Sequence, residues 1–179
     1  MEAKVADLSY AMDAIESRYH ISGTVRKPEG LEFTFQHEGK PKKCLFKLPE
    51  NSWYTSDYSA PAGLKTVLQH AEKSPFGKGG ETIVDDSVRT AQHVVPEKFK
   101  VNFDPADELL EIVRKRLVPD STSISAKLLK LNIYGKDGHF ARHLDTPRGD
   151  DFFGSLVVCV PVLFNGGQLK LYHSGQSVT

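Results

Sequence analysis

Two side chains separated by a single residue, His143 and Asp145, carry the clearest chemical signal in this sequence. The residues around them alternate between apolar and polar and predict a β-strand, in which side chains two positions apart point to the same face. An imidazole nitrogen and a carboxylate oxygen then meet at one point. These groups are two of the three ligands of the facial triad that holds Fe(II) and leaves positions open for other molecules. We therefore expect His143 and Asp145 to be metal ligands.

The sequence around this pair resembles a known family. The stretch Lys127–Arg148 contains the pair, an apolar run Phe153–Pro161 follows, and Gly166–His173 begins with two glycines. This order is similar to that of the 2-oxoglutarate/Fe(II)-dependent dioxygenases of the prolyl 4-hydroxylase type. In that family a strand ending in tyrosine leads through a glycine-containing turn to a His-x-Asp-Thr motif, and an apolar strand, a Gly-Gly turn and another strand follow. Upstream, Ser74–Arg89 resembles a segment that precedes the oxygenase core in one branch of these proteins.

The resemblance implies an oxidoreductase that uses Fe(II), 2-oxoglutarate and dioxygen to hydroxylate a substrate C–H bond, with a protein or peptide side chain such as proline as the substrate. It makes His143 and Asp145 catalytic iron ligands. Tyr134 matches a tyrosine that contacts 2-oxoglutarate in related hydroxylases, although a tyrosine at a strand end is equally often a core residue with a solvated hydroxyl. Arg148 could steer an anionic co-substrate, but a salt bridge in a surface loop is the simpler interpretation.

Two features of the family pattern are missing from the sequence, namely the distal iron histidine and the later basic residue that pairs with 2-oxoglutarate. His173 is the only histidine after Asp145, and a strand histidine with a local hydrogen bond is its ordinary interpretation. The chain therefore resembles a member truncated at its C-terminus. Because two ligands hold Fe(II) weakly, the alternative is an inactive member that serves as an interaction module. A cupin-like binding protein or isomerase is disfavoured, since such proteins normally collect more histidines around their metal.

Local sequence patterns predict the secondary structure that surrounds these residues. Hydrophobic spacing predicts helices over Ala3–Tyr19 and Ala62–Lys73. Turn sequences separate three strand candidates, Ile21–Val25, Leu31–Gln36 and Cys44–Leu48. Phe76–Gly80 contains three glycines but lacks the rest of a phosphate-binding loop, so a flexible connector is the simpler interpretation.

The later part of the chain changes from helix to strands. Asp104 and Pro105 predict a helix start, and the helix should run to about Leu117. Strands are expected from Ser125 onward, and the apolar run Ser155–Phe164 should be a strand buried on both faces. The pattern favours an α+β fold with N-terminal helices packed on a partial double-stranded β-helix, or jelly roll. We expect residues 1–60 to form an α+β extension and residues 61–179 an incomplete oxygenase domain with leading helices.

The overall composition narrows the possible partners. The chain has 179 residues, with 23 lysines and arginines against 23 aspartates and glutamates. This balance gives no field that favours nucleic acid or an anionic membrane. The N-terminus lacks the apolar stretch of a signal peptide, and no segment is long enough for a transmembrane helix. Cys44 and Cys159 have no metal or redox spacing, and Cys159 is expected to be a small buried residue. We expect an intracellular protein, cytoplasmic or nuclear.

Overall fold

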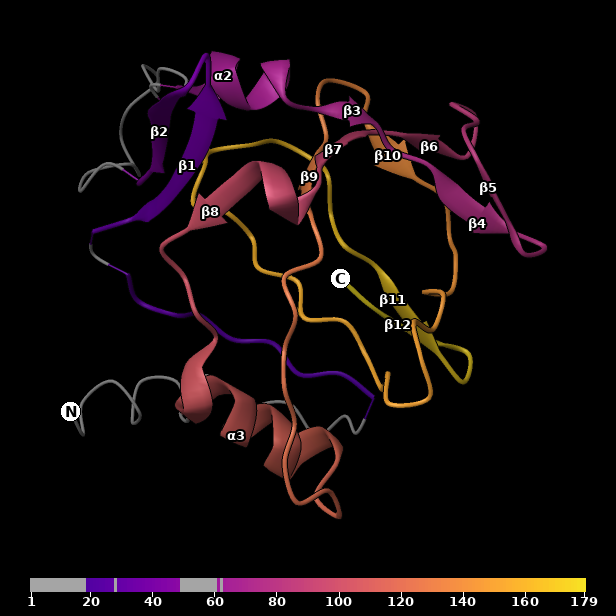
Figure 1. Cartoon of the computed structure of the whole chain (residues 1–179). Coiled ribbons are helices and arrows are strands. Elements are labelled where there is room, and N and C mark those ends of the chain that lie inside the picture. Colours follow the sequence, from indigo (N-terminus) through magenta and orange to yellow (C-terminus); the bar gives the residue numbers. More distant parts are fainter. Residues whose placement is uncertain (1–18, 28, 49–60, 62) are drawn as a thin grey trace. The chain divides into compact units, whose positions relative to one another are not determined.

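The computed structural model describes residues 19–27, 29–48, 61 and 63–179. The chain divides into two compact units. The larger unit comprises Gly30–Asn102 and Leu128–Gln168, and the smaller one combines Phe103–Lys127, Leu169–Thr179 and the first 29 residues. Small antiparallel sheets and a few helices make up the described residues (Figure 1). The mixed α and β content is therefore confirmed.

A three-stranded antiparallel sheet in the order β2-β1-β8 is the best-packed part of the larger unit. Its strands are β1 (Leu31–His37), β2 (Lys40–Phe46) and β8 (Phe99–Val101). Two of these strands were expected, and both are confirmed, with β2 beginning four residues earlier than predicted. The alternation of apolar residues places one face of β1 in the core. The buried apolar side chains of the sheet are Leu31, Phe33, Phe35, Cys44, Phe46 and Phe99.

A short helix, α2 (Leu64–Gln69), lies against this sheet and buries Val67. Its N-cap is Gly63, whose φ of 87° is in the left-handed region that favours glycine. A Cβ at this position would lie 2.4 Å from the carbonyl oxygen of Lys43, so the contact between helix and sheet requires glycine. The helix is shorter than the predicted Ala62–Lys73, because the last two of those residues pair with β7 instead.

The remaining strands of the larger unit are short. One three-stranded sheet has the order β3-β7-β9, formed by Glu72–Lys73, Gln92–Val94 and Leu131–Ile133. In a separate pair, β6 (Arg89–Thr90) lies antiparallel to β10 (His139–Phe140). The stretch Phe76–Gly80, expected to be a flexible connector, instead begins a hairpin of β4 (Phe76–Lys78) and β5 (Glu81–Ile83). Gly79 and Gly80, with φ of 59° and 89°, form its turn. The single-turn 3-10 helix η2 (Pro96–Lys98) precedes β8.

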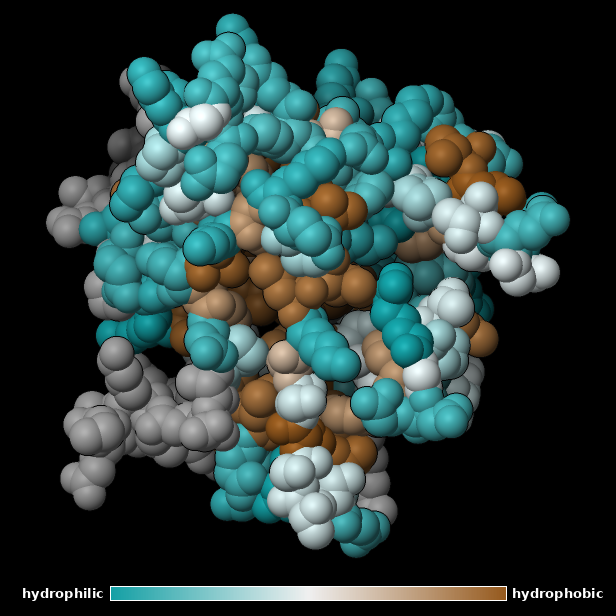
Figure 2. Space-filling model, in the orientation of Figure 1, coloured by the Kyte–Doolittle hydropathy of each residue, from teal (hydrophilic) through white to brown (hydrophobic). Residues whose placement is uncertain are grey.

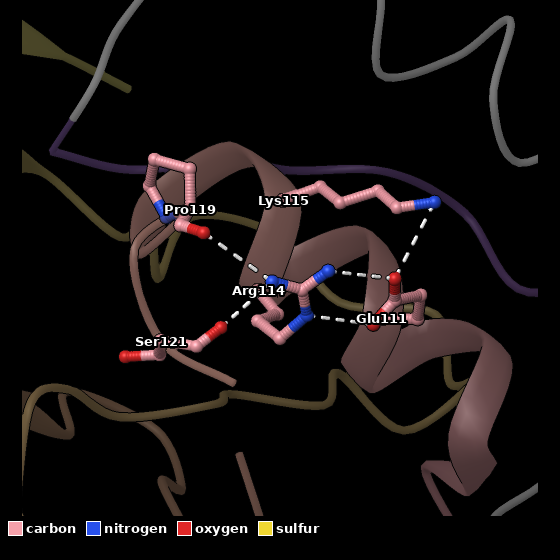
Figure 3. Close-up of polar contacts among 5 residues, drawn as sticks. All are labelled: Glu111, Arg114, Lys115, Pro119 and Ser121. Carbon is pink, nitrogen blue, oxygen red and sulfur yellow. Dashed lines mark hydrogen bonds and ion pairs between the residues drawn. The ribbon is translucent and has the colours of Figure 1, made fainter. Parts of the chain in front are cut away.

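The smaller unit contains the longest helix described, α3 (Ala106–Leu117), and a hairpin of β11 (Leu171–His173) and β12 (Gln176–Val178). The helix was predicted, although its N-cap is Pro105 rather than Asp104. Near its C-terminal end, Arg114 donates hydrogen bonds of 2.8 and 2.9 Å to both carboxylate oxygens of Glu111 and one of 2.7 Å to the carbonyl oxygen of Ser121 (Figure 3). Positive charge at this end also suits the helix dipole.

Several predicted strands are wrong. Ile21–Val25, the residues immediately before β9 and Ser155–Phe164 have no strand structure. The last of these is also largely exposed rather than buried, and its Cys159 lies at the surface. Apolar side chains accordingly appear on the surface of the molecule (Figure 2). A strand requires a hydrogen-bonded neighbour, and this segment pairs with no other in the described part of the chain.

The predicted jelly roll and the predicted N-terminal helix are not confirmed, for different reasons. The described strands form no closed barrel, so the jelly roll is not confirmed. The predicted helix Ala3–Tyr19 lies outside the described residues apart from its last position. Among the residues that the structure describes, no helix has the length and apolar character needed to cross a bilayer.

Candidate metal site

His143 and Asp145 converge, although the strand predicted to carry them is wrong. β10 ends at Phe140, and residues 141–148 have no regular structure. Even so, Nε2 of His143 lies 3.5 Å from Oδ1 of Asp145. Leu144, between them, is 94% exposed. The alternation expected of a strand therefore persists in this irregular segment, with the two polar side chains on one side and the leucine in solvent.

Two contacts orient the imidazole of His143. Its Nδ1 lies 2.8 Å from the carbonyl oxygen of Ala141, and because a carbonyl only accepts, Nδ1 must carry the proton. In the neutral ring this leaves the lone pair on Nε2, the atom that faces Asp145. The ring also stacks on Phe140, with centroids 3.6 Å apart and planes inclined by 17°. A backbone carbonyl that accepts from the second nitrogen is typical of metal-binding histidines.

The carboxylate of Asp145 is oriented from its other side. Ser155 donates a hydrogen bond of 2.5 Å to Oδ2, so Oδ1 is the oxygen directed at His143. Ligands about 2.1 Å from a divalent metal and separated by 90–110° lie about 3.0–3.4 Å apart. The observed 3.5 Å needs only a small adjustment to match this. The side chains are 40% and 56% exposed, so solvent and small molecules reach the pair.

In the part of the chain that the structure describes, no third protein ligand lies near this pair. Among the described residues, no group of three or more histidine, cysteine, aspartate or glutamate side chains is arranged to hold a metal. His139 is exposed, and its ring nitrogens lie 3.3 Å from the carbonyl oxygens of Asp137 and Ser87. His173 belongs to the smaller unit and stacks on Tyr19 at 4.4 Å. The pair thus fits two coordination positions of a metal ion, and the remaining positions would be open to water or a bound molecule.

An arginine that sequence reasoning did not single out lies behind the pair. Arg89 is only 4% exposed, and β6 pairs it directly with Phe140 of β10. Its guanidinium carbon lies 4.4 Å from the centre of the Phe140 ring. Since His143 already occupies one face of that ring at 3.6 Å, the guanidinium must cover the other face. Phe140 is therefore packed between a cation and the imidazole, and only the pairing of β6 with β10 reveals this arrangement.

Of the other predicted site residues, Tyr134 contacts Arg89, and Arg148 affects the nearby Lys130. Tyr134, immediately after β9, is 45% exposed, and its hydroxyl oxygen accepts a long hydrogen bond of 3.4 Å from Nη2 of Arg89. Arg148 is exposed. Burial, and then the positive charges of Arg89 and Arg148, lower the pKa of Lys130, while Asp145 acts in the opposite direction. Arg148 is thus close enough to influence this cluster electrostatically.

No protein-family model, curated protein or solved structure matches the chain. The contacts described above are therefore the basis for assigning a function. They bring together His143, Asp145 and Ser155 at one point and Arg89 and Tyr134 at another, with Phe140 linking the two.

Proposed function

We propose that this chain is a 2-oxoglutarate/Fe(II)-dependent dioxygenase whose iron is held by His143 and Asp145. The observation that carries the proposal is the 3.5 Å separation of Nε2 and Oδ1, in a pair whose other polar atoms are already hydrogen bonded. Ligand atoms that converge and are held in orientation are what a metal site requires. The partial double-stranded β-helix belongs to the same proposal.

The residues around the pair have separate roles in this function. His143 binds through Nε2 with Phe140 fixing its ring, and Asp145 binds through Oδ1 while Ser155 holds Oδ2. Bound Fe(II) supplies open coordination positions for 2-oxoglutarate and dioxygen. Tyr134 and Arg148 offer a hydroxyl and a positive charge to the anionic co-substrate. The substrate is a protein or peptide side chain, proline being the example that the resemblance implies.

Anaerobic titration tests the metal site first. Fe(II) and 2-oxoglutarate are added to the purified chain while the weak visible charge-transfer band and, after admission of air, succinate are measured. His143→Ala and Asp145→Ala are expected to weaken Fe(II) binding by at least about 10- to 100-fold. His139→Ala is the matched control, because this exposed histidine contacts only backbone oxygens. Equal affinity in all variants would show that the pair is not the metal site.

A non-enzymatic interaction module is the second candidate. It is favoured by the lack of a third ligand among the described residues and by the exposed apolar segment Ser155–Phe164. The same titration separates the two functions. Fe(II) binding at His143 and Asp145 without the charge-transfer band and without succinate supports the interaction module, whereas succinate formed at the expense of 2-oxoglutarate supports the oxygenase.

A further inference from the structure

Two adjacent residues, Val88 immediately before β6 and Arg89 within it, support His143 by separate contacts. The carbonyl oxygen of Val88 accepts a hydrogen bond of 2.8 Å from the backbone N–H of Ala141, and the carbonyl of Ala141 in turn accepts from Nδ1 of His143. Arg89 lies against the Phe140 ring on which the imidazole stacks. Since β10 ends at Phe140, these contacts hold the histidine at a point that the sheet no longer reaches.

The guanidinium of Arg89 is itself held in place. The residue is 4% exposed, and it donates hydrogen bonds of 2.9 Å to the Pro75 carbonyl, 3.0 Å to the Asn132 amide oxygen and 3.4 Å to the Tyr134 hydroxyl. These acceptors come from two separate parts of the chain, so they fix the guanidinium from more than one direction. A planar cation fixed in this way is suited to stack on an aromatic ring and support it.

The guanidinium attracts the Phe140 ring more strongly than an uncharged neighbour would. A cation within about 6 Å of an aromatic centroid interacts favourably with the face of the ring, and the attraction increases when water is excluded. The distance of 4.4 Å from Cζ of Arg89 to the ring centre is well within this limit. The imidazole of His143 stacks with its centroid 3.6 Å from the same centre, so the phenyl ring cannot tilt without weakening one of the two contacts.

We propose that Arg89 is a positioning residue for the metal site and that it holds the imidazole of His143 in its binding orientation through the Phe140 ring. The inference rests on the proposed metal site and extends it to a residue that has no role in the proposed function so far. An imidazole that is already oriented loses less conformational freedom when a metal binds, so the affinity is higher. Asp145 is held separately by Ser155 and should not depend on Arg89.

Titration of the full chain with Zn²⁺ tests this role, because Zn²⁺ is diamagnetic and binds the same nitrogen and oxygen ligands. Binding is followed through the imidazole signals of His143 by NMR. Arg89→Met removes the cation but keeps a long apolar side chain, and we expect it to weaken Zn²⁺ binding by about 10-fold. Arg89→Lys keeps a cation and should recover part of this loss. Lys136→Met, at an exposed lysine in the turn before β10, removes the same charge and should leave the affinity unchanged.

A double-mutant cycle shows whether the effect passes through the phenyl ring. Phe140→Leu alone should also weaken Zn²⁺ binding by about 10-fold. Adding Arg89→Met to it should then cause little further loss, because the effects of residues that act through one contact do not add. A loss of about 100-fold in the double variant would overturn the proposal, since Arg89 would then act independently of Phe140. Equal affinities for Arg89→Met and Lys136→Met would overturn it as well.

The orientation of the imidazole is measured without metal, which separates this inference from the proposed function. In the native chain the ring current of Phe140 should shift the imidazole proton signals of His143 upfield, and Arg89→Met should reduce that shift. Gly63→Ala, which strains the contact between α2 and β2, should leave it unchanged, so general destabilisation is not the cause. An imidazole that does not respond to Zn²⁺ would contradict the proposed metal site, whereas one that responds but keeps its upfield shift in Arg89→Met would contradict only the role of Arg89.

Discussion

The β2-β1-β8 sheet and the segment Ser155–Phe164 belong to the same compact unit and are both rich in apolar residues. In the sheet, β1 has a neighbour on each side, and its Phe33 and Phe35 are buried. In the segment, which has no strand neighbour in the described part of the chain, Val157 and Phe164 are exposed. An apolar run is therefore buried only where a second surface covers it, because the free energy of burial comes from apolar area removed from water.

The largest contrast should appear when a phenylalanine in each region is truncated. Phe35 is 0% exposed and Phe164 is 62% exposed. Phe35→Ala is expected to lower the free energy of unfolding by about 3–5 kcal/mol because it leaves a cavity. Phe164→Ala should change it by no more than about 0.5 kcal/mol. Urea unfolding measures both, and similar losses in the two variants would mean that the segment is packed in solution.

The two cysteines test the same contrast without changing the fold. Burial raises the pKa of Cys44, on β2, from 9.0 to about 11, whereas Cys159 in the segment is exposed. Since the thiolate is the reactive form, the raised pKa alone slows Cys44 by about 100-fold at neutral pH. Mass spectrometry after timed alkylation should find label on Cys159 long before Cys44. Equal rates in the native protein would contradict the packing of β2.

A matched pair of glycines should give a smaller effect. Gly63 has a φ of 87°, and a Cβ there would meet the backbone of β2. Gly63→Ala is therefore expected to cost about 1–3 kcal/mol of stability. A Cβ on Gly154, just before the exposed segment, would meet nothing within 4 Å, so Gly154→Ala should be nearly neutral. Thermal unfolding compares the two, and an equally large loss at Gly154 would indicate that this part of the chain is covered.

The salt bridge between Arg114 and Glu111, which lies outside both regions, should have the smallest effect on stability. The hydrogen bond from Arg114 holds the pKa of Glu111 at about 2, below its usual 4.5. Because the folded-state pKa is the lower one, the stabilisation is present at neutral pH and is lost as the pH falls from about 4.5 to about 2. Glu111→Gln should therefore lower the urea midpoint slightly at pH 7 and not at pH 2. Glu97→Gln, at an exposed carboxylate, is the control and should leave the urea midpoint at pH 7 unchanged.

The fold was predictable where local sequence determines structure. β1, β2 and α3 follow from alternation, turn residues and helical spacing, and all three are present. Ile21–Val25 and Ser155–Phe164 have equally good strand composition and form no strand. Strand formation depends on a partner elsewhere in the chain, and a single sequence does not reveal which segments pair.

The candidate site, like the fold, was predictable only where it depends on residues that are close together in the sequence. The spacing of His143 and Asp145, together with the resemblance of the residues around them to a known family, predicted that the two side chains converge, because alternation along a few residues is a local property. Arg89 was not identified, since a lone arginine in a two-residue strand has no distinguishing pattern and comes to lie on Phe140 only through the pairing of β6 with β10.

The position of Phe140 has a consequence for how this protein could be shortened. Its phenyl ring is supported on one side by an arginine that comes about fifty positions earlier in the chain. A polypeptide that began after Thr90 would keep both candidate ligands and lose the support for the ring on which His143 rests. If His143 and Asp145 bind a metal as proposed, such a fragment should bind it less tightly, because the histidine would have to be ordered at the moment of binding.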